Sequence, residues 1–197
     1  MSPDCRQMDA SGKWGCIMRS KMLMAWLAAI ALLFPVSRAI AQERSASSEY
    51  IVKAAFLYNF ALYTEWPLIP HEAFEFCVLG SDPFGIHLDN IGRKKLQGKA
   101  IHIRRLTATT GLNPKGCHLL FVPAVEKENY QLLAASLSQQ AILTVTDAQQ
   151  ADGKWPMIII SLVPEGERFT FDINQGAARV AGLSFSSKLL HLARNVK

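Results

Sequence analysis

The residues best suited to chemistry in this chain are polar side chains that follow predicted strands. Ser81 and Asp82 lie in the segment 80–85 (GSDPFG), which follows an apolar run and opens a predicted helix, and Asp147 ends the apolar run 142–146. Ligands of α/β sheets bind outside the carboxyl ends of the strands, so we expect Ser81, Asp82 and Asp147 to line one crevice. Two carboxylates there could serve acid and base chemistry. Ordinary helix capping explains the same residue types and is the favoured interpretation.

Other catalytic and metal-binding patterns are missing from the sequence. The histidines are scattered without the short spacings of zinc sites: His71, His87, His102, His118 and His191. Cys117 adjoins His118 on a predicted strand, where neighbouring side chains point to opposite faces. The chain has no Gly-x-Ser-x-Gly elbow, glycine-rich phosphate loop or dinucleotide fingerprint. We therefore predict no enzymatic activity, no catalytic residue, no metal site and no cofactor.

Residues 18–41 are typical of a secretory signal peptide. Arg19 and Lys21 precede the apolar run 22–34, and Ala39-Ile40-Ala41 forms a cleavage triplet. An uncleaved anchor would need a longer apolar run, since a spanning helix takes about 20 residues. We expect export to the periplasm with cleavage after Ala41. Residues 1–17 are then an untranslated or disordered extension, with translation starting at Met18.

The remaining residues, 42–197, suit a single domain. They carry 16 basic and 14 acidic side chains, a net charge of +2 against +5 for the whole chain, which gives no electrostatic case for binding nucleic acid. Basic residues gather at 93–95, at Lys99 and at 104–105. A solvated rim is the favoured interpretation of this cluster, and a patch that faces an acidic partner or anionic lipid is the alternative.

Two cysteines, Cys77 and Cys117, follow the predicted leader. Disulfides persist outside the cytoplasm, so a bond is one interpretation, provided that the two α-carbons approach within about 7 Å. Two buried, unbonded thiols are the other interpretation, because free cysteine often packs in cores.

Apolar runs of strand length alternate with helix-like stretches along the mature chain. Strands are predicted at 74–79, 100–106, 118–122, 142–146, 157–163 and 168–173, and helices at 49–66, 84–94, 126–139, 176–181 and 186–195. This rhythm predicts an α/β fold, a three-layer sandwich with a mostly parallel mixed sheet of about six strands. Turn residues at 164–167 predict an antiparallel hairpin near the C-terminus.

The predicted helix 49–66 is apolar around most of its circumference. Such a helix is either buried on several sides, which is the favoured interpretation, or offers a face to a partner. Phe56 and Phe60 are the candidate contact residues under the second interpretation.

Several segments together resemble the YfiR family of bacterial periplasmic regulators. They are residues 52–60 (VKAAFLYNF) with 65–67 (EWP), 77–85 (CVLGSDPFG), 117–121 (CHLLF), 143–147 (LTVTD), 171–174 (FDIN), 181–183 (AGL) and 186–190 (SSKLL). One departure is 153–158 (GKWPMI), where the family typically has a Gly-Gly-Met-Ile stretch. Trp155 in this segment is a candidate contact residue if exposed, and the alternative is that it folds back onto the sheet.

The resemblance implies a binding protein that tends to form homodimers. Similar proteins restrain an inner-membrane diguanylate cyclase by contacting its periplasmic region, which lowers cyclic di-GMP and biofilm formation. An outer-membrane lipoprotein is a further expected partner. The alternative function is a periplasmic small-ligand sensor that uses the crevice beside Ser81, Asp82 and Asp147.

Overall fold

The computed structural model describes residues 35–67, 72–108, 110–138, 140–148, 155–166 and 168–197, with side chains from Ser48 onward. Ser47–Lys197 form one compact unit. The predicted extension 1–17 and most of the predicted leader, 18–34, lie outside the described residues. Among the helices that are described, none has the length and apolar character needed to cross a membrane.

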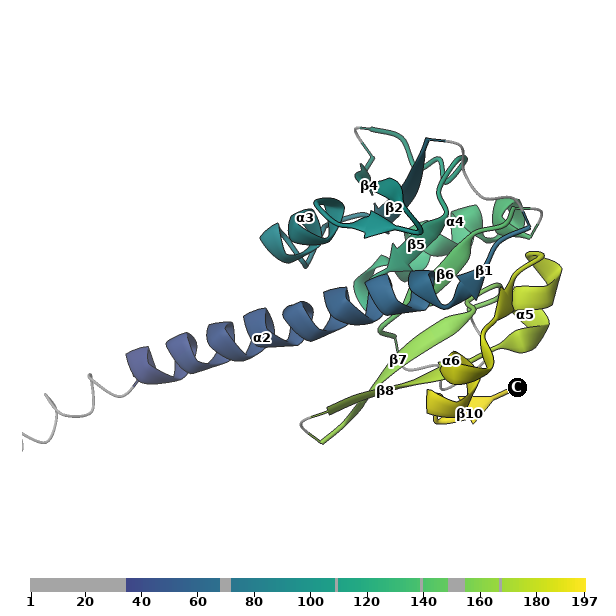
Figure 1. The fold of residues 1–197 in the computed structure, drawn as a ribbon. Coiled ribbons are helices and arrows are strands. Elements are labelled where there is room, and N and C mark those ends of the chain that lie inside the picture. Colours follow the sequence, from purple (N-terminus) through teal and green to yellow (C-terminus); the bar gives the residue numbers. More distant parts are fainter. Residues whose placement is uncertain (1–34, 68–71, 109, 139, 149–154, 167) are drawn as a thin grey trace, which may run out of the picture. The chain divides into compact units, whose positions relative to one another are not determined.

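An eight-stranded sheet forms the centre of the compact unit (Figure 1). Its strands stand in the order β10-β8-β7-β6-β5-β2-β4-β3, and those from β4 to β7 run parallel. The strands are β2 (Ala73–Leu79), β3 (Lys95–Leu96), β4 (Lys99–Leu106), β5 (Leu119–Val122), β6 (Leu143–Thr146), β7 (Ile160–Glu165), β8 (Arg168–Ile173) and β10 (Asn195–Val196). A separate small sheet pairs β1 (Thr64–Glu65) with β9 (Ser184–Phe185).

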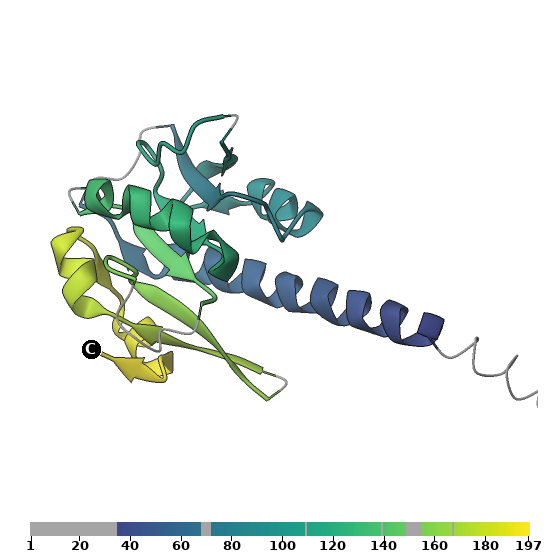
Figure 2. The same cartoon turned by 180° about the vertical axis from the view of Figure 1, so that it is seen from behind.

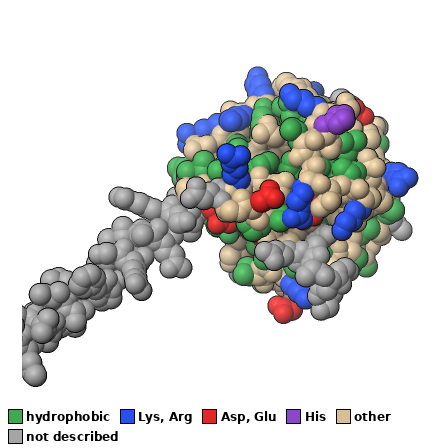
Figure 3. Space-filling model, turned by 90° about the horizontal axis from the view of Figure 1, so that it is seen from below, with side chains coloured by type: hydrophobic (Ala, Val, Ile, Leu, Met, Phe, Trp, Pro, Cys, Tyr) green, Lys and Arg blue, Asp and Glu red, His purple; other side chains and the backbone are tan. Residues whose placement is uncertain are grey.

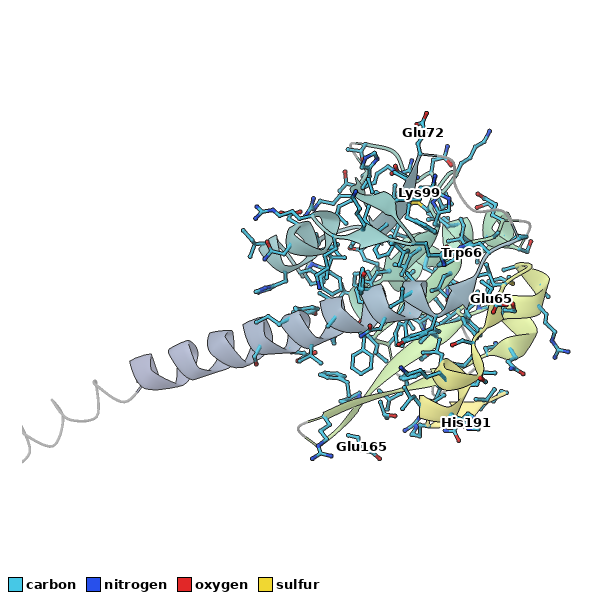
Figure 4. The ribbon with its side chains drawn as sticks, viewed as in Figure 1. Glu65, Trp66, Glu72, Lys99, Glu165 and His191 are labelled. Atoms are coloured by element: carbon cyan, nitrogen blue, oxygen red, sulfur yellow. A yellow bond between two sulfur atoms is a disulfide. The ribbon has the colours of Figure 1, made fainter. Side chains whose placement is uncertain are left out.

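The predicted fold class is confirmed. All six expected strands are present, and β3 and β10 add two residues each at the edges of the sheet. β7 and β8 form the expected antiparallel hairpin. In Figure 4, Glu165 lies near the tip of this hairpin, and Glu65 lies at the end of β1. The turn is tighter than predicted, because Pro164 and Glu165 belong to β7 and Glu165 pairs with Arg168.

Helices cover both faces of the sheet (Figure 2). They are α2 (Pro35–Leu62), α3 (Ile86–Gly92), the 3₁₀ turn η1 (Ala124–Glu126), α4 (Lys127–Leu137), α5 (Gln175–Val180) and α6 (Ser187–Leu192). The residues of α2 in the compact unit, with α3, α5 and α6, share one hydrophobic cluster with the sheet, and α4 shares the other. This arrangement gives three layers.

Strand β2 shows why the sheet needs cover on both sides. Successive side chains of a strand point to opposite faces. Phe74, Phe76 and Val78 accordingly enter the α2 cluster, whereas Cys77 and Leu79 enter the α4 cluster. All five are buried, as expected for a central parallel strand.

Some helices end earlier than predicted, because the residues expected at their ends pair with strands instead. Helix α2 ends at Leu62 rather than at Trp66, because Thr64 and Glu65 pair with β9. The last helix ends at Leu192 instead of near Asn195, which pairs with β8. Helix α3 begins only at Ile86, since Gly85 has a φ of 52°, outside the helical region.

A disulfide joins strand β2 to the segment that leads into β5. The sulfurs of Cys77 and Cys117 lie 1.96 Å apart, with 5.9 Å between the α-carbons. Of the two interpretations that the sequence left open, the structure has the bonded one. Arg104 lies against this bond, and one of its terminal nitrogens is 3.0 Å from Cys117 Sγ and 2.8 Å from the carbonyl oxygen of Lys115.

Replacing both cysteines with alanine should lower the free energy of unfolding by about 4 kcal/mol. The bond spans a sequence separation of 40 residues, and a cross-link of that span removes about 4 kcal/mol of chain entropy from the unfolded state. Guanidinium unfolding of oxidised wild type and C77A/C117A measures the difference. A reducing agent should bring the wild type close to the variant and leave the variant unchanged. If the reducing agent left the free energy of unfolding of the wild type unchanged, that result would contradict the disulfide.

Candidate functional site

The predicted crevice residues lie at the carboxyl ends of the central strands, as expected. Ser81 and Asp82 follow β2, and Asp147 follows β6. Strand β5 stands between β2 and β6, so two strand spacings, about 10 Å, separate the strand ends that the two aspartates follow. They share an edge of the sheet without forming a close acid and base pair.

Asp82 is bound within the fold. Its Oδ1 accepts hydrogen bonds from the amides of Phe84 (2.8 Å) and Gly85 (3.4 Å), and its Oδ2 accepts one from Arg105 Nε (2.7 Å). Arg105 also contacts Asp89 at 2.8 Å. These bonds brace the loop before α3 against β4. The favoured interpretation of Ser81 or Asp82 as the cap of this helix is wrong, because the N-cap is Gly85 and no side chain caps the helix.

Asp147 is bound to helix α2. Its Oδ2 lies 2.7 Å from Lys53 Nζ, and its Oδ1 accepts the amide of Ala124 at 2.9 Å. Lys53 also contacts Glu49, four residues earlier on the same helix. The side chains of Lys53 and Asp147 are only 4% and 10% exposed. This ion pair therefore joins α2 to the carboxyl edge of the sheet.

Burial and pairing act on Lys53 in opposite directions. Burial by itself lowers the pKa of an ammonium group, but the hydrogen bonds to Asp147 and Glu49 favour the charged form. The hydrogen bonds and nearby negative charges together outweigh burial, so the pKa of Lys53 lies above its ordinary value. Lys53 is therefore a fixed positive charge at neutral pH and not a candidate general base.

Glu126 lies against the loop that follows β2. Its carboxylate accepts the amide of Ser81 (3.2 Å) and the side-chain amide of Asn129 (2.7 Å). It also lies where a β-carbon of residue 80 would be, and the φ of 69° at Gly80 is a conformation that favours glycine. A ligand that reached Asp82 or Asp147 would have to displace Arg105 or Lys53.

Cys117 and His118 do not form a nucleophile and base pair. Cys117 is bonded to Cys77. His118 accepts the amide of Glu75 on Nδ1 (3.0 Å), and burial lowers the pKa of His118. Within the described part of the chain, no cluster of three or more His, Cys, Asp or Glu residues could hold a metal ion.

The candidate contact residues differ in exposure. Phe60 is 1% exposed and packs its ring on Phe171 (4.9 Å between centroids), so it belongs to the core. Phe56 is half-buried between the same two rings. The expectation that these two phenylalanines form an outward face of α2 is therefore wrong for Phe60, because the sheet covers that side of the helix.

Trp155 is also in the core. It is 8% exposed and packs against Tyr130, 5.3 Å between ring centroids. The Tyr130 hydroxyl donates to the carbonyl oxygen of Pro156, and burial raises the pKa of Tyr130. Of the two interpretations that the sequence left open for Trp155, the structure has the buried one, in which the side chain folds back onto the sheet. The preceding residues 149–154 lie outside the described residues.

The side of α2 that faces solvent is formed by residues other than the two candidates named from the sequence. Ile51, Val52 and Leu62 are 49%, 44% and 37% exposed. Their three- and four-residue spacing with Ala55 and Asn59 was visible in the sequence, but apolar residues elsewhere on the helix obscured it.

Comparison with protein families matches residues 50–194 to the YfiR/HmsC-like family. No curated protein gives a significant match. The matched region covers nearly all of the compact unit, including α2 from Tyr50 onward, the central sheet except β10, and the C-terminal helices.

Replacing Lys53 with methionine should destabilise the fold by about 3–5 kcal/mol, since it leaves the Asp147 carboxylate buried without its counter-charge. Urea unfolding measures the loss, and adding Asp147→Asn should restore part of it. Lys188→Met is the control, because Lys188 lies over the Tyr63 ring on the surface and should contribute less than about 1 kcal/mol. A K53M protein as stable as the wild type would contradict the role of this pair.

The same pair predicts a pH dependence. The pKa of Lys53 is raised on folding, so the charge of Lys53 contributes to the free energy of unfolding. This contribution is complete below the pKa of the unfolded state, about 10.4, and is lost as the pH rises through the higher pKa of the folded state. The stability difference between wild type and K53M should thus be constant through neutral pH and shrink only above about pH 10.4. A difference that shrank between neutral pH and mild alkali would argue against a raised pKa.

Proposed function

Because the chain belongs to the YfiR/HmsC-like family, a non-catalytic family of regulators in cyclic di-GMP signalling, we propose that it inhibits a diguanylate cyclase of the inner membrane by direct contact. The contact is with the periplasmic region of that enzyme, and its result is lower cyclic di-GMP and less biofilm. The family match over residues 50–194 is the observation that carries the proposal.

The geometry of the sheet edge supports a role in binding rather than catalysis. Asp82 and Asp147, the two carboxylates best placed for acid and base chemistry, are engaged by Arg105 and Lys53. An enzyme needs such groups free to meet a substrate. The proposed protein acts through its surface, and turnover by this chain forms no part of the proposal.

Export is part of the same proposal, because the contact lies outside the cytoplasm. The predicted leader, 18–41, delivers the chain to the periplasm and is removed after Ala41. An outer-membrane lipoprotein and a second copy of the chain are proposed as further partners there.

Deleting the gene should raise cellular cyclic di-GMP several-fold, because the cyclase loses its inhibitor, and the full-length gene should restore the low level. Cyclic di-GMP extracted from cells and measured by mass spectrometry gives the readout. A gene that lacks codons 19–41 but keeps Met18 as its start codon is the matched control and should not restore it, since its product stays away from the periplasmic region of the cyclase.

Unchanged cyclic di-GMP in the deletion strain, with the cyclase expressed, would refute the proposal. Strong stabilisation of the purified protein by one metabolite in a thermal-shift screen would favour the small-ligand sensor instead, since a ligand bound only to the native state raises its stability.

A further inference from the structure

Helix α2 turns a narrow, mostly apolar stripe toward solvent. Ile51, Val52 and Leu62 are 49%, 44% and 37% exposed, and Ala55 and Asn59 are exposed between them. We refer to these five residues as the α2 stripe. A helix face in contact with water normally carries charged and polar residues, yet four of the five are apolar and none is charged. The stripe therefore has the composition of a covered surface.

The spacing within the stripe is that of a coiled-coil seam. Steps of three, four and three residues separate the members that form the seam: Val52, Ala55, Asn59 and Leu62. These are the a and d positions of a heptad, which pack as knobs into the holes of a facing helix. Asparagine at an a position selects a defined two-helix pairing at some cost in stability. The seam thus suits a single partner helix.

One border of the stripe is basic. Tyr58 lies beside it on α2, and its hydroxyl donates to the carbonyl oxygen of Lys95 at 3.0 Å. Lys94 Nζ lies 5.0 Å from the centre of the Tyr58 ring. Lys94, Lys95 and the preceding Arg93 are all exposed. Figure 3 shows a face of the protein on which hydrophobic and basic side chains lie among one another.

We propose that the α2 stripe docks one amphipathic helix of the partner protein, with acidic residues along the edge that faces Lys94 and Lys95. The inference rests on the proposed function, in which the partner is the periplasmic region of the cyclase. Opposite charges on the flanks of a helix pair select the partner and its orientation. Antiparallel pairing of two copies would bring the basic borders together, and this repulsion disfavours a second copy as the occupant.

The test compares variants in the deletion strain. Val52→Glu with Ala55→Glu places two charges in the seam, and Leu132→Glu is the control, because Leu132 is 76% exposed on α4, away from α2. The seam variant should leave cyclic di-GMP at the level of the deletion strain, whereas the control should restore the low level. Circular dichroism and melting temperatures matching the wild type establish that both variants fold.

The basic border is tested in the same cells. Lys94→Glu with Lys95→Glu should weaken repression, and Lys115→Glu, a reversal at an exposed site outside the stripe and its border, should not. If the wild type lowers cyclic di-GMP and the seam variant does so equally well, the docking surface is refuted while the proposed function stands. If the wild type itself has no effect, the proposed function fails.

Two further measurements separate other occupants. Light scattering that finds a wild-type dimer and a monomeric seam variant would assign the stripe to a second copy and overturn the proposal. Flotation of the wild type, but not of the seam variant, with vesicles of phosphatidylglycerol and phosphatidylethanolamine would assign it to a lipid surface. Oligomeric state and flotation that are the same for wild type and seam variant are the expected results.

Discussion

The ion pair between Lys53 and Asp147 is the interaction on which the arrangement of this protein depends. It connects the middle of α2 to the carboxyl end of β6, across 94 residues of sequence. A buried pair of this kind has little tolerance for displacement, because either charge left alone in the interior would be costly. The pair therefore sets the rotation of α2 on the sheet, which decides which side of the helix is buried and which side faces solvent.

Two functional consequences follow from that rotation. At the sheet edge, Lys53 neutralises the carboxylate that could otherwise meet a ligand, and Glu126 and Arg105 complete the closure around Ser81 and Asp82. On the outside of the helix, the same rotation presents the uncharged α2 stripe. The place where α/β proteins usually bind ligands is thus filled by the protein's own side chains. The exposed apolar surface lies instead on helix α2.

The two sides of the sheet are stabilised differently. On the α4 side, the disulfide ties β2 to the segment before β5, and Trp155 packs on Tyr130. On the α2 side, aromatic contacts dominate, such as that between Phe60 and Phe171. A rigid sheet braced from both faces gives α2 a firm base, which matters for a surface that must keep its shape when a partner binds.

Much of the architecture was determined by the sequence itself, because the alternation of apolar strands and helical stretches is a local signal. It located all six main strands, the C-terminal hairpin and the family resemblance. The tertiary structure alone decided what depends on contacts between distant residues: the bond between Cys77 and Cys117, the partner of Asp147, the burial of Phe60 and Trp155, and the ends of α2 and α6. Apolar residues surround α2 in the sequence, and only the sheet that covers one side of it distinguishes core residues from the stripe left facing water.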